Sequence, residues 1–250
     1  MKRGLILAAV LLVGTAGTAS AATITQNTNA GTLYNTTSVE DTTLGDEMGG
    51  MTVVATLINQ NGSTFQLNGV WTDGAFGLGG VINWVNIFGD DEFNLSVWGD
   101  TYTQGIWNLN FDFDSANYRL GALAFDGRPG NTVFDTRFGG NTGTAGSSSG
   151  RDFAGFNPYD GNITATYSNA VGLNGAAPVG DLYTNFLLMF GNGSFGQGLR
   201  QSRDTYNFTL DTDNARTSLA QTAVPEPGSM ILLGTGLVGL ASRMRRKKAA

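Results

Sequence analysis

The segment from residue 107 to residue 114 alternates strictly between large apolar and polar side chains. One face would carry Trp107, Leu109, Phe111 and Phe113, and the other Asn108, Asn110, Asp112 and Asp114. Because successive side chains of a β-strand point to opposite faces, this pattern predicts a strand with one buried face and one wet, acidic face. A half-buried strand of this kind is typical of an antiparallel sheet.

Several other short segments have strand character, and clusters of glycine, aspartate and asparagine separate many of them. They are residues 51–58, 81–88, 93–98, 118–125, 133–138, 162–167, 182–190 and 206–210. The segment 182–190 is apolar on both faces, which fits a central strand buried on both sides or a short helix. With 37 glycines, about twice the usual share, the chain favours turns over long helices. We therefore predict an all-β body, an antiparallel β-sandwich that is jelly-roll-like.

Charge is distributed unevenly along the chain. Lysine occurs only at Lys2, Lys247 and Lys248, and the part between the two ends holds seven arginines against 19 acidic residues. This part therefore has a net charge of about −12, which would repel nucleic acid and anionic lipid. We predict no nucleic-acid partner.

The chain has no histidine and no cysteine. Their absence excludes disulfides, Cys/His zinc sites, a Ser–His triad and a Cys–His dyad.

The N-terminus has the three parts of a secretory signal peptide. Lys2 and Arg3 form the positive start, a short apolar run follows, and Ala19-Ser20-Ala21 provides the small residues that a signal peptidase requires beside its cut. We predict a signal peptide over residues 1–21, cleaved after Ala21, with Ala22 as an alternative site.

The C-terminus also has three parts in a fixed order. A proline motif, Val224-Pro225-Glu226-Pro227, should be extended and accessible because its prolines oppose helix continuation and sheet pairing. An apolar, glycine-containing stretch follows, and the basic cluster Arg243, Arg245, Arg246, Lys247 and Lys248 ends the chain. The 14 residues from Ser229 to Ser242 would form about 21 Å of helix, which is short against a hydrocarbon core of ~30 Å. By the positive-inside rule the basic cluster would stay in the cytoplasm and the body would lie outside.

In order and spacing, this tail resembles the PEP-CTERM sorting domain. The resemblance covers residues 224–250 and implies recognition of Pro225-Glu226-Pro227 by an exosortase, a membrane protease-like enzyme of bacteria that make exopolysaccharide. The alternative is an ordinary C-terminal membrane anchor. The expected organisation is a signal peptide over 1–21, a β-sandwich body over 22–211, a linker over 212–223, and the sorting signal with its short transmembrane helix over 224–250.

Three features of the body suggest sites. The acidic groups Asp90-Asp91-Glu92 and Asp211-x-Asp213-Asn214 suggest calcium ligands, but an EF-hand loop beginning at Asp211 fails, because Arg216 and Thr222 stand where glycine and glutamate are needed. Calcium sites of β-sandwiches have no reliable linear signature, so we predict no cofactor and leave a structural calcium ion open.

Trp71 and Trp98 stand at strand ends where they could contact sugars, whereas Trp84 and Trp107 fit the core. No two acids stand out as a pair for glycoside hydrolysis.

These patterns favour a non-enzymatic, structural protein that is exported, anchored transiently in the inner membrane, and sorted to the cell envelope or the extracellular matrix. Two alternatives remain open at this point. One is a carbohydrate-binding module for exopolysaccharide, and the other is a secreted glycan-active enzyme that uses aspartate and glutamate. The expected partners are signal peptidase, exosortase, the membrane through the C-terminal helix and, for the binding alternative, exopolysaccharide.

Overall fold

The computed structural model describes residues 23–26, 34–74, 79–84, 92–103, 105–112, 117–137, 143–156, 162–199 and 206–216. The predicted signal peptide, with Ala19 and Ala21, lies outside these residues. So do the sorting motif Val224–Pro227, the basic cluster and the predicted transmembrane helix. Within the described part of the chain, no helix is long and apolar enough to cross a membrane.

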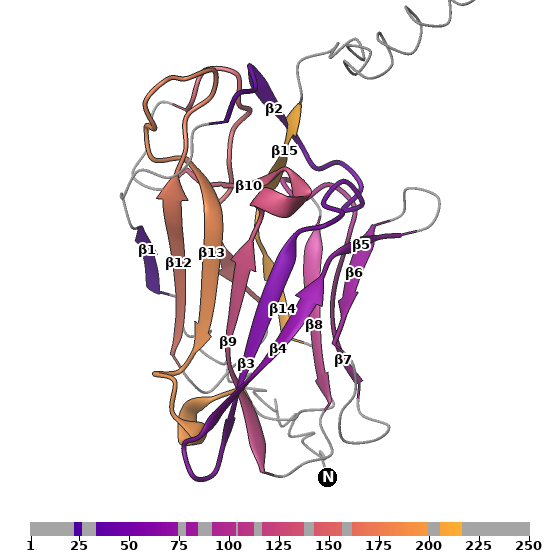
Figure 1. The fold of residues 1–250 in the computed structure, drawn as a ribbon, viewed down its shortest axis with the longest axis vertical. Helices are drawn as coiled ribbons and strands as arrows, with labels where there is room; N and C mark the ends of the chain where they lie inside the picture. Colours follow the sequence, from indigo (N-terminus) through magenta and orange to yellow (C-terminus); the bar gives the residue numbers. More distant parts are fainter. Residues whose placement is uncertain are drawn as a thin grey trace, which may run out of the picture.

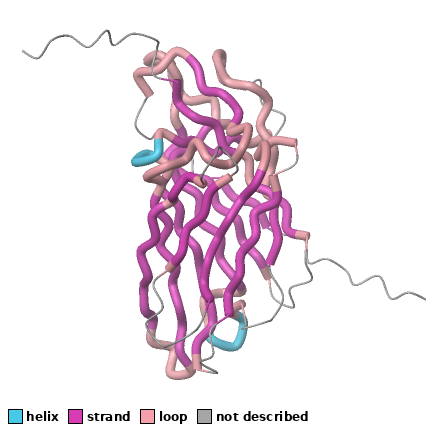
Figure 2. Tube along the Cα trace, turned by 90° about the vertical axis from the view of Figure 1, so that its right-hand side faces the viewer, coloured by secondary structure: helices cyan, strands magenta, loops and turns pink. Residues whose placement is uncertain are grey.

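Two β-sheets make up the described body, and their strands run along the long axis of the molecule with loops at both ends (Figures 1 and 2). The larger sheet contains β1 (Thr23–Gln26), β2 (Ser38–Asp41), β3 (Thr52–Asn59), β4 (Thr64–Val70), β9 (Tyr118–Asp126), β10 (Thr132–Asp135), β12 (Ile163–Ala170), β13 (Leu182–Phe190) and β15 (Thr212–Arg216). The smaller sheet contains β5 (Thr72–Asp73), β6 (Gly80–Asn83), β7 (Glu92–Trp98), β8 (Ile106–Asp112), β11 (Ala154–Gly155) and β14 (Tyr206–Thr209). All pairs of named strands are antiparallel except β1 with β12.

The inner faces of the two sheets meet in one aromatic core. Trp107 of β8 packs edge-on against Phe125 of β9, with ring centroids 6.1 Å apart, and stacks on Phe208 of β14. Phe153 joins the sheets again, because it contacts both Phe208 and Phe186 of β13. Aromatic rings bury much apolar area per residue and prefer edge-on or offset-stacked contacts of this kind. The described body is therefore all-β and antiparallel, as predicted, with two sheets packed around one core. Its assignment as a jelly-roll-like sandwich stays a prediction.

Strand β13 is the branch point of the larger sheet. One of its edges pairs with β12, and the other pairs first with β10 and then with β9. Strands β9 and β10 thus pair one after the other with the same edge of β13. The short connection between them contains the 3-10 helix η2 (Arg128–Gly130). Beyond β9 lie β3 and β4, whereas beyond β10 lie β15 and β2, at the upper end in Figure 1.

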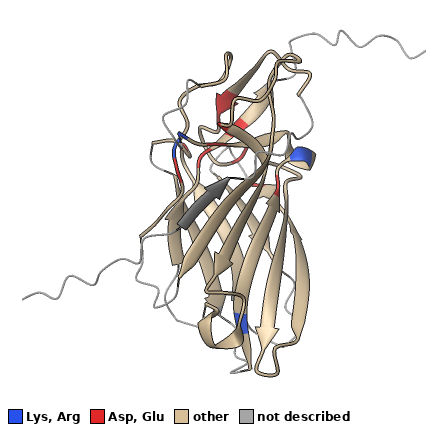
Figure 3. Cartoon of the chain, turned by 90° about the vertical axis from the view of Figure 1, so that its left-hand side faces the viewer, with Lys and Arg blue, Asp and Glu red and all other residues tan. Residues whose placement is uncertain are grey.

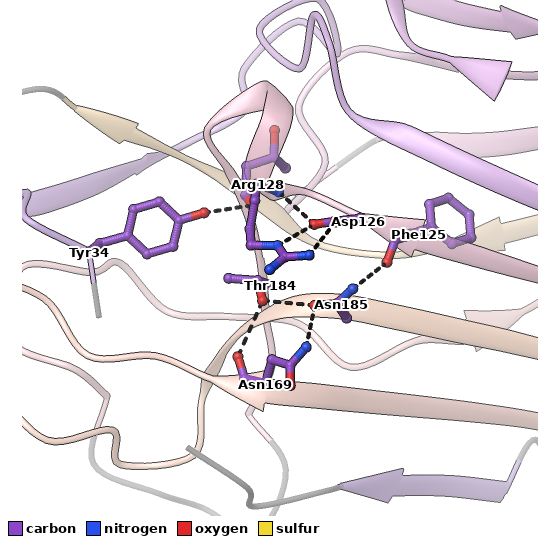
Figure 4. A network of polar contacts seen from close by, with 8 residues as sticks. Tyr34, Phe125, Asp126, Arg128, Asn169, Thr184 and Asn185 are labelled. Atoms are coloured by element: carbon purple, nitrogen blue, oxygen red, sulfur yellow. Dashed lines mark hydrogen bonds and ion pairs between the residues drawn. The ribbon is translucent and has the colours of Figure 1, made fainter. Parts of the chain in front are cut away.

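Polar contacts hold the connection between β9 and β10 in place (Figure 4). Arg128 forms two hydrogen bonds to the Asp126 carboxylate, of 2.8 and 2.6 Å, which lower the pKa of Asp126. Asn185 of β13 donates to the Phe125 carbonyl at 3.4 Å and accepts from Asn169 at 2.6 Å. Since the Arg128 side chain is 53% exposed, the ion pair contributes little to stability, and we interpret the network as structural.

The predicted strands are found, with shifted ends. Segment 182–190, left open between strand and helix, is strand β13. The predicted strand 107–114 corresponds to β8, Ile106–Asp112. Residues 113–114, like 85–88 and 138 of two other predicted strands, lie outside the described residues. The expectation of a linker over 212–223 is wrong for residues 212–216. These residues form β15, which pairs with both β10 and β2, so the body extends at least to Arg216.

Candidate functional site

Three aspartates meet at the upper end of the larger sheet. Asp135 is the last residue of β10, Asp211 directly precedes β15, and Asp213 lies within β15. The backbone N–H of Asp135 donates to the carbonyl of Asp211 at 3.2 Å, so these two residues stand opposite each other. Because residues two apart on a strand share a face, Asp213 points to the same side as Asp211. One carboxylate oxygen from each of the three lies within 4.8 Å of the others.

This three-aspartate cluster is shut off from solvent. The exposed fractions are 1% for Asp135 and 0% for both Asp211 and Asp213. Both faces of the strands here are covered, because Phe134 and Thr212 point to the main core while Val133 belongs to a second, smaller apolar cluster beside the aspartates.

The loop 143–150 supplies one hydroxyl to the cluster. Ser147 Oγ lies 2.9 Å from Asp135 Oδ2 and 3.2 Å from Asp213 Oδ2, and its single proton serves only one of them at a time. Thr101 Oγ1 donates to Asp211 Oδ1 at 3.3 Å. Asp211 Oδ2 and Asp213 Oδ1 are buried without any hydrogen-bond partner.

Two further aspartates lie near the cluster. Asp41 of β2 stands opposite Asp213 in the strand register and accepts a hydrogen bond from Ser148. Asp181 accepts hydrogen bonds from Thr144 Oγ1, at 2.6 Å, and from the N–H of Leu182, at 2.9 Å. In Figure 3 most of the described acidic residues gather at this upper end of the molecule.

The environment opposes ionisation of the cluster. Burial is the first cause in each case, and the negative charges of neighbouring aspartates add to it. Together they raise the pKa of Asp211 to about 9 and raise the pKa values of Asp135 and Asp213 well above the usual range. Asp41 contributes to all three shifts, and Asp181 contributes to the shift of Asp135.

A second candidate surface is the outer face of the smaller sheet. Here Trp98, 56% exposed, stands opposite Ile106, 44% exposed, in the register of β7 and β8. Outward positions on β6, β7, β8 and β14 carry mainly uncharged polar residues: Asn83, Asn94, Ser96, Asn108, Asn110 and Asn207. Val81 is an apolar exception, and the acidic pair Glu92 and Asp112 continues the register at the end of β7 and β8 that lies away from Trp98. Near Trp98 the face thus combines an exposed indole with uncharged polar residues.

The expected exposure of Trp71 is wrong. Trp71 is 1% exposed, because the chain crosses at this residue from β4 in one sheet to β5 in the other and directs the indole between them. Its ring lies 5.3 Å from that of Trp107 and beside Gly80, where a β-carbon would collide with it. Trp71 is therefore not an exposed surface for sugar, whereas the exposure of Trp98 is confirmed. The placement of Trp84 and Trp107 in the core is also confirmed.

The structure brings Asp211 and Asp213 together with Asp135, which the sequence did not single out. No local signal marks Asp135 or Ser147, because both join the group through pairing between distant strands. Of the other acidic group, Asp90 and Asp91 lie outside the described residues and Glu92 begins β7.

Fold and site together define a class: an all-β protein with an acidic body and a dry group of aspartates. The tail adds a more particular identification, since residues 223–247 match the PEP-CTERM protein-sorting motif. The predicted resemblance is confirmed for the C-terminal tail. The motif implies export, sorting at the membrane with an exosortase as the processing partner, and delivery to the envelope. Comparisons with curated proteins and with solved structures give no match for the chain.

Proposed function

We propose that this chain is a non-enzymatic structural protein that an exosortase delivers to the cell envelope or the extracellular matrix. The observation that carries the proposal is the sorting motif directly behind a folded body: β15 ends at Arg216, and the motif match begins at residue 223. A tail so close to the last strand suits an enzyme that separates it from a finished β-sandwich.

The architecture of the body supports a non-enzymatic role. A carboxylate that acts on a glycan must reach the scissile bond. The three-aspartate cluster is 0–1% exposed, so a polymeric substrate has no access to it. The absence of histidine and cysteine removes the commonest nucleophile–base pairs as well.

Replacing Pro225, Glu226 and Pro227 with alanine tests the sorting role. We expect the variant to keep its tail and accumulate in the inner membrane, whereas the wild-type protein appears in the envelope or medium with a lower mass. Cell fractionation followed by intact-mass measurement distinguishes the two. Triple alanine replacement of Thr217, Ser218 and Leu219 is the matched control and should be sorted normally. Identical processing of the wild-type chain and the Pro-Glu-Pro variant would refute the proposed role.

The outer face of the smaller sheet favours a second candidate function, the binding of a neutral exopolysaccharide. An indole face stacks on the apolar face of a sugar ring, and amides can donate and accept hydrogen bonds with its hydroxyls. Trp98 has the exposure that this contact requires, and the next outward positions on β7 and β8, Ser96 and Asn108, are uncharged.

We expect Trp98→Ala to weaken such binding by roughly tenfold, which corresponds to the loss of about 1.4 kcal/mol of contact energy. Affinity electrophoresis in gels that contain the producing organism's own polysaccharide measures the effect. Phe65→Ala, which removes a 41% exposed ring from β4 of the other sheet, is the matched control. If the polysaccharide does not retard the wild-type protein, this candidate function is wrong.

A further inference from the structure

Among the described residues, no arginine forms an ion pair with the three-aspartate cluster. Ionised carboxylates lose several kcal/mol of hydration when they are buried without a partner. The chain has no lysine between Lys2 and Lys247, and the largest charge effects on the cluster come from other aspartates. The hydroxyls of Ser147 and Thr101 provide too few protons for six carboxylate oxygens. Something else must neutralise the group for it to stay ionised.

The unpartnered oxygens point to a cation. Asp211 Oδ2 and Asp213 Oδ1 are buried without a hydrogen-bond donor, whereas Ser147 and Thr101 serve the other oxygen of each carboxylate. The Asp41 carboxyl also lies against that of Asp213, but it brings a further acid and no positive charge. Buried polar atoms in native proteins are nearly always satisfied, so such exceptions need an explanation. A cation held among the three carboxylates would give such buried oxygens a partner.

The donor set selects the kind of cation. The donors are all oxygens, since the chain has neither histidine nor cysteine. Oxygen ligands favour hard cations over the softer transition metals. Calcium binds oxygens at 2.3–2.6 Å in adaptable geometry, so its ligand oxygens lie up to about 5 Å apart, which suits oxygens within 4.8 Å of one another. Magnesium prefers a strict octahedron that retains several waters, and a buried group of three carboxylates suits it less well.

We propose that Asp135, Asp211 and Asp213 bind one calcium ion at the upper end of the larger sheet. Each aspartate supplies a carboxylate oxygen, and Ser147 Oγ lies beside two of them as a further oxygen donor. Asp41, opposite Asp213 on β2, adds negative charge at the edge of the site.

The position of the site gives the ion a structural role. Asp135 belongs to β10, the other two ligands bracket the start of β15, and Ser147 belongs to the loop 143–150. A bound ion therefore joins the last described strand to the sheet and to this loop. Since β15 leads into the sorting tail, the ion reinforces the part of the body that any pull on the tail reaches first. Extracellular modules bind calcium with dissociation constants of about 10⁻⁴–10⁻³ M, a range that suits an exported protein.

Calcium titration of the full chain, purified in a mild detergent and stripped with EDTA, tests the proposal. We expect binding heat with about one ion per chain, and a rise of roughly 5–10 °C in melting temperature at a calcium concentration 100 times the dissociation constant. Absence of both heat and melting shift in the wild-type chain overturns the proposal. An equal shift with magnesium chloride overturns the assignment to calcium.

Variants locate the ion. Asp213→Asn and Asp135→Asn should each weaken calcium binding at least tenfold, while both remain folded in EDTA because each change removes a charge that repels its neighbours. Asp126→Asn, which removes a carboxylate paired with Arg128 outside the cluster, should bind calcium like the wild type. If Asp213→Asn and Asp135→Asn, melting cooperatively in EDTA, keep the full calcium response, the ion does not bind at this cluster.

Discussion

Trp107→Ala is expected to lower the free energy of unfolding by about 3–5 kcal/mol. The Trp107 side chain is fully buried and contacts aromatic rings of both sheets, so its removal leaves a cavity between them. Its indole N–H also donates to the Leu210 carbonyl at 2.8 Å, and the substitution leaves that buried acceptor unpaired. Single domains are stable by only about 5–15 kcal/mol, so the loss is a large share of the total. Urea denaturation of the full chain in detergent measures it.

Trp98→Ala is the matched control, because it removes the same side chain from the outer face of the same sheet. At 56% exposure Trp98 should contribute less than about 1 kcal/mol to stability. The two variants thus distinguish a side chain that stabilises the fold, Trp107, from one that is available to a ligand, Trp98. Similar losses of stability in the two variants would contradict this division.

The strands that the sequence predicted are those whose pattern is local. In β8 the buried positions are Trp107, Leu109 and Phe111, and nothing beyond the strand itself is needed to recognise the alternation. Strand β4 gave no such signal, since only Leu67 and Gly69 are buried and its remaining residues face solvent. An edge strand with so little apolar surface resembles a loop in a single sequence.

The polar strands explain why the three-aspartate cluster was only half predicted. Strand β15, with the sequence TDNAR, looks like a linker because its buried positions carry threonine and aspartate in place of apolar residues. Its pairing with β10 and β2 depends on segments far away in the chain, which local periodicity cannot show. The mistaken linker and the missing ligand Asp135 therefore have one cause. The acids that make β15 look like a linker are the ones that the proposed calcium site uses.

The same reasoning applies to Trp71, where a turn sequence directly after the tryptophan indicated exposure. A strand end on one sheet can also be the crossing to the other, and the indole at such a crossing lies between the layers. Whether such a tryptophan is exposed or buried depends on where the partner sheet lies, and not on the residues next to it in the sequence.

Without calcium, the stability of the protein is expected to fall as the pH rises from about 5 to 8. In that state the cluster's aspartates have raised pKa values, about 9 for Asp211, whereas an unfolded aspartate titrates near 3.9. Between these values the folded chain holds protons that the unfolded chain has released. Stability then decreases with pH, by up to about 1.4 kcal/mol per pH unit for each carboxyl that keeps its proton. The contribution is fully present below the unfolded pKa and is lost as the pH rises to the folded pKa.

Saturating calcium should remove most of this pH dependence, because the ion holds the carboxylates ionised in the folded state. Asp213→Asn should reduce the slope in EDTA by about the share of one carboxyl, since it removes one titrating group and one repelling charge. Urea denaturation at several pH values, in EDTA and in calcium, measures both effects. A stability in EDTA that is flat or rises between pH 5 and 8 would show that the cluster keeps no protons. The raised pKa values connect the two conditions: without calcium, retained protons neutralise the buried aspartates until the pH passes the folded pKa values, and with calcium the bound ion takes the place of those protons.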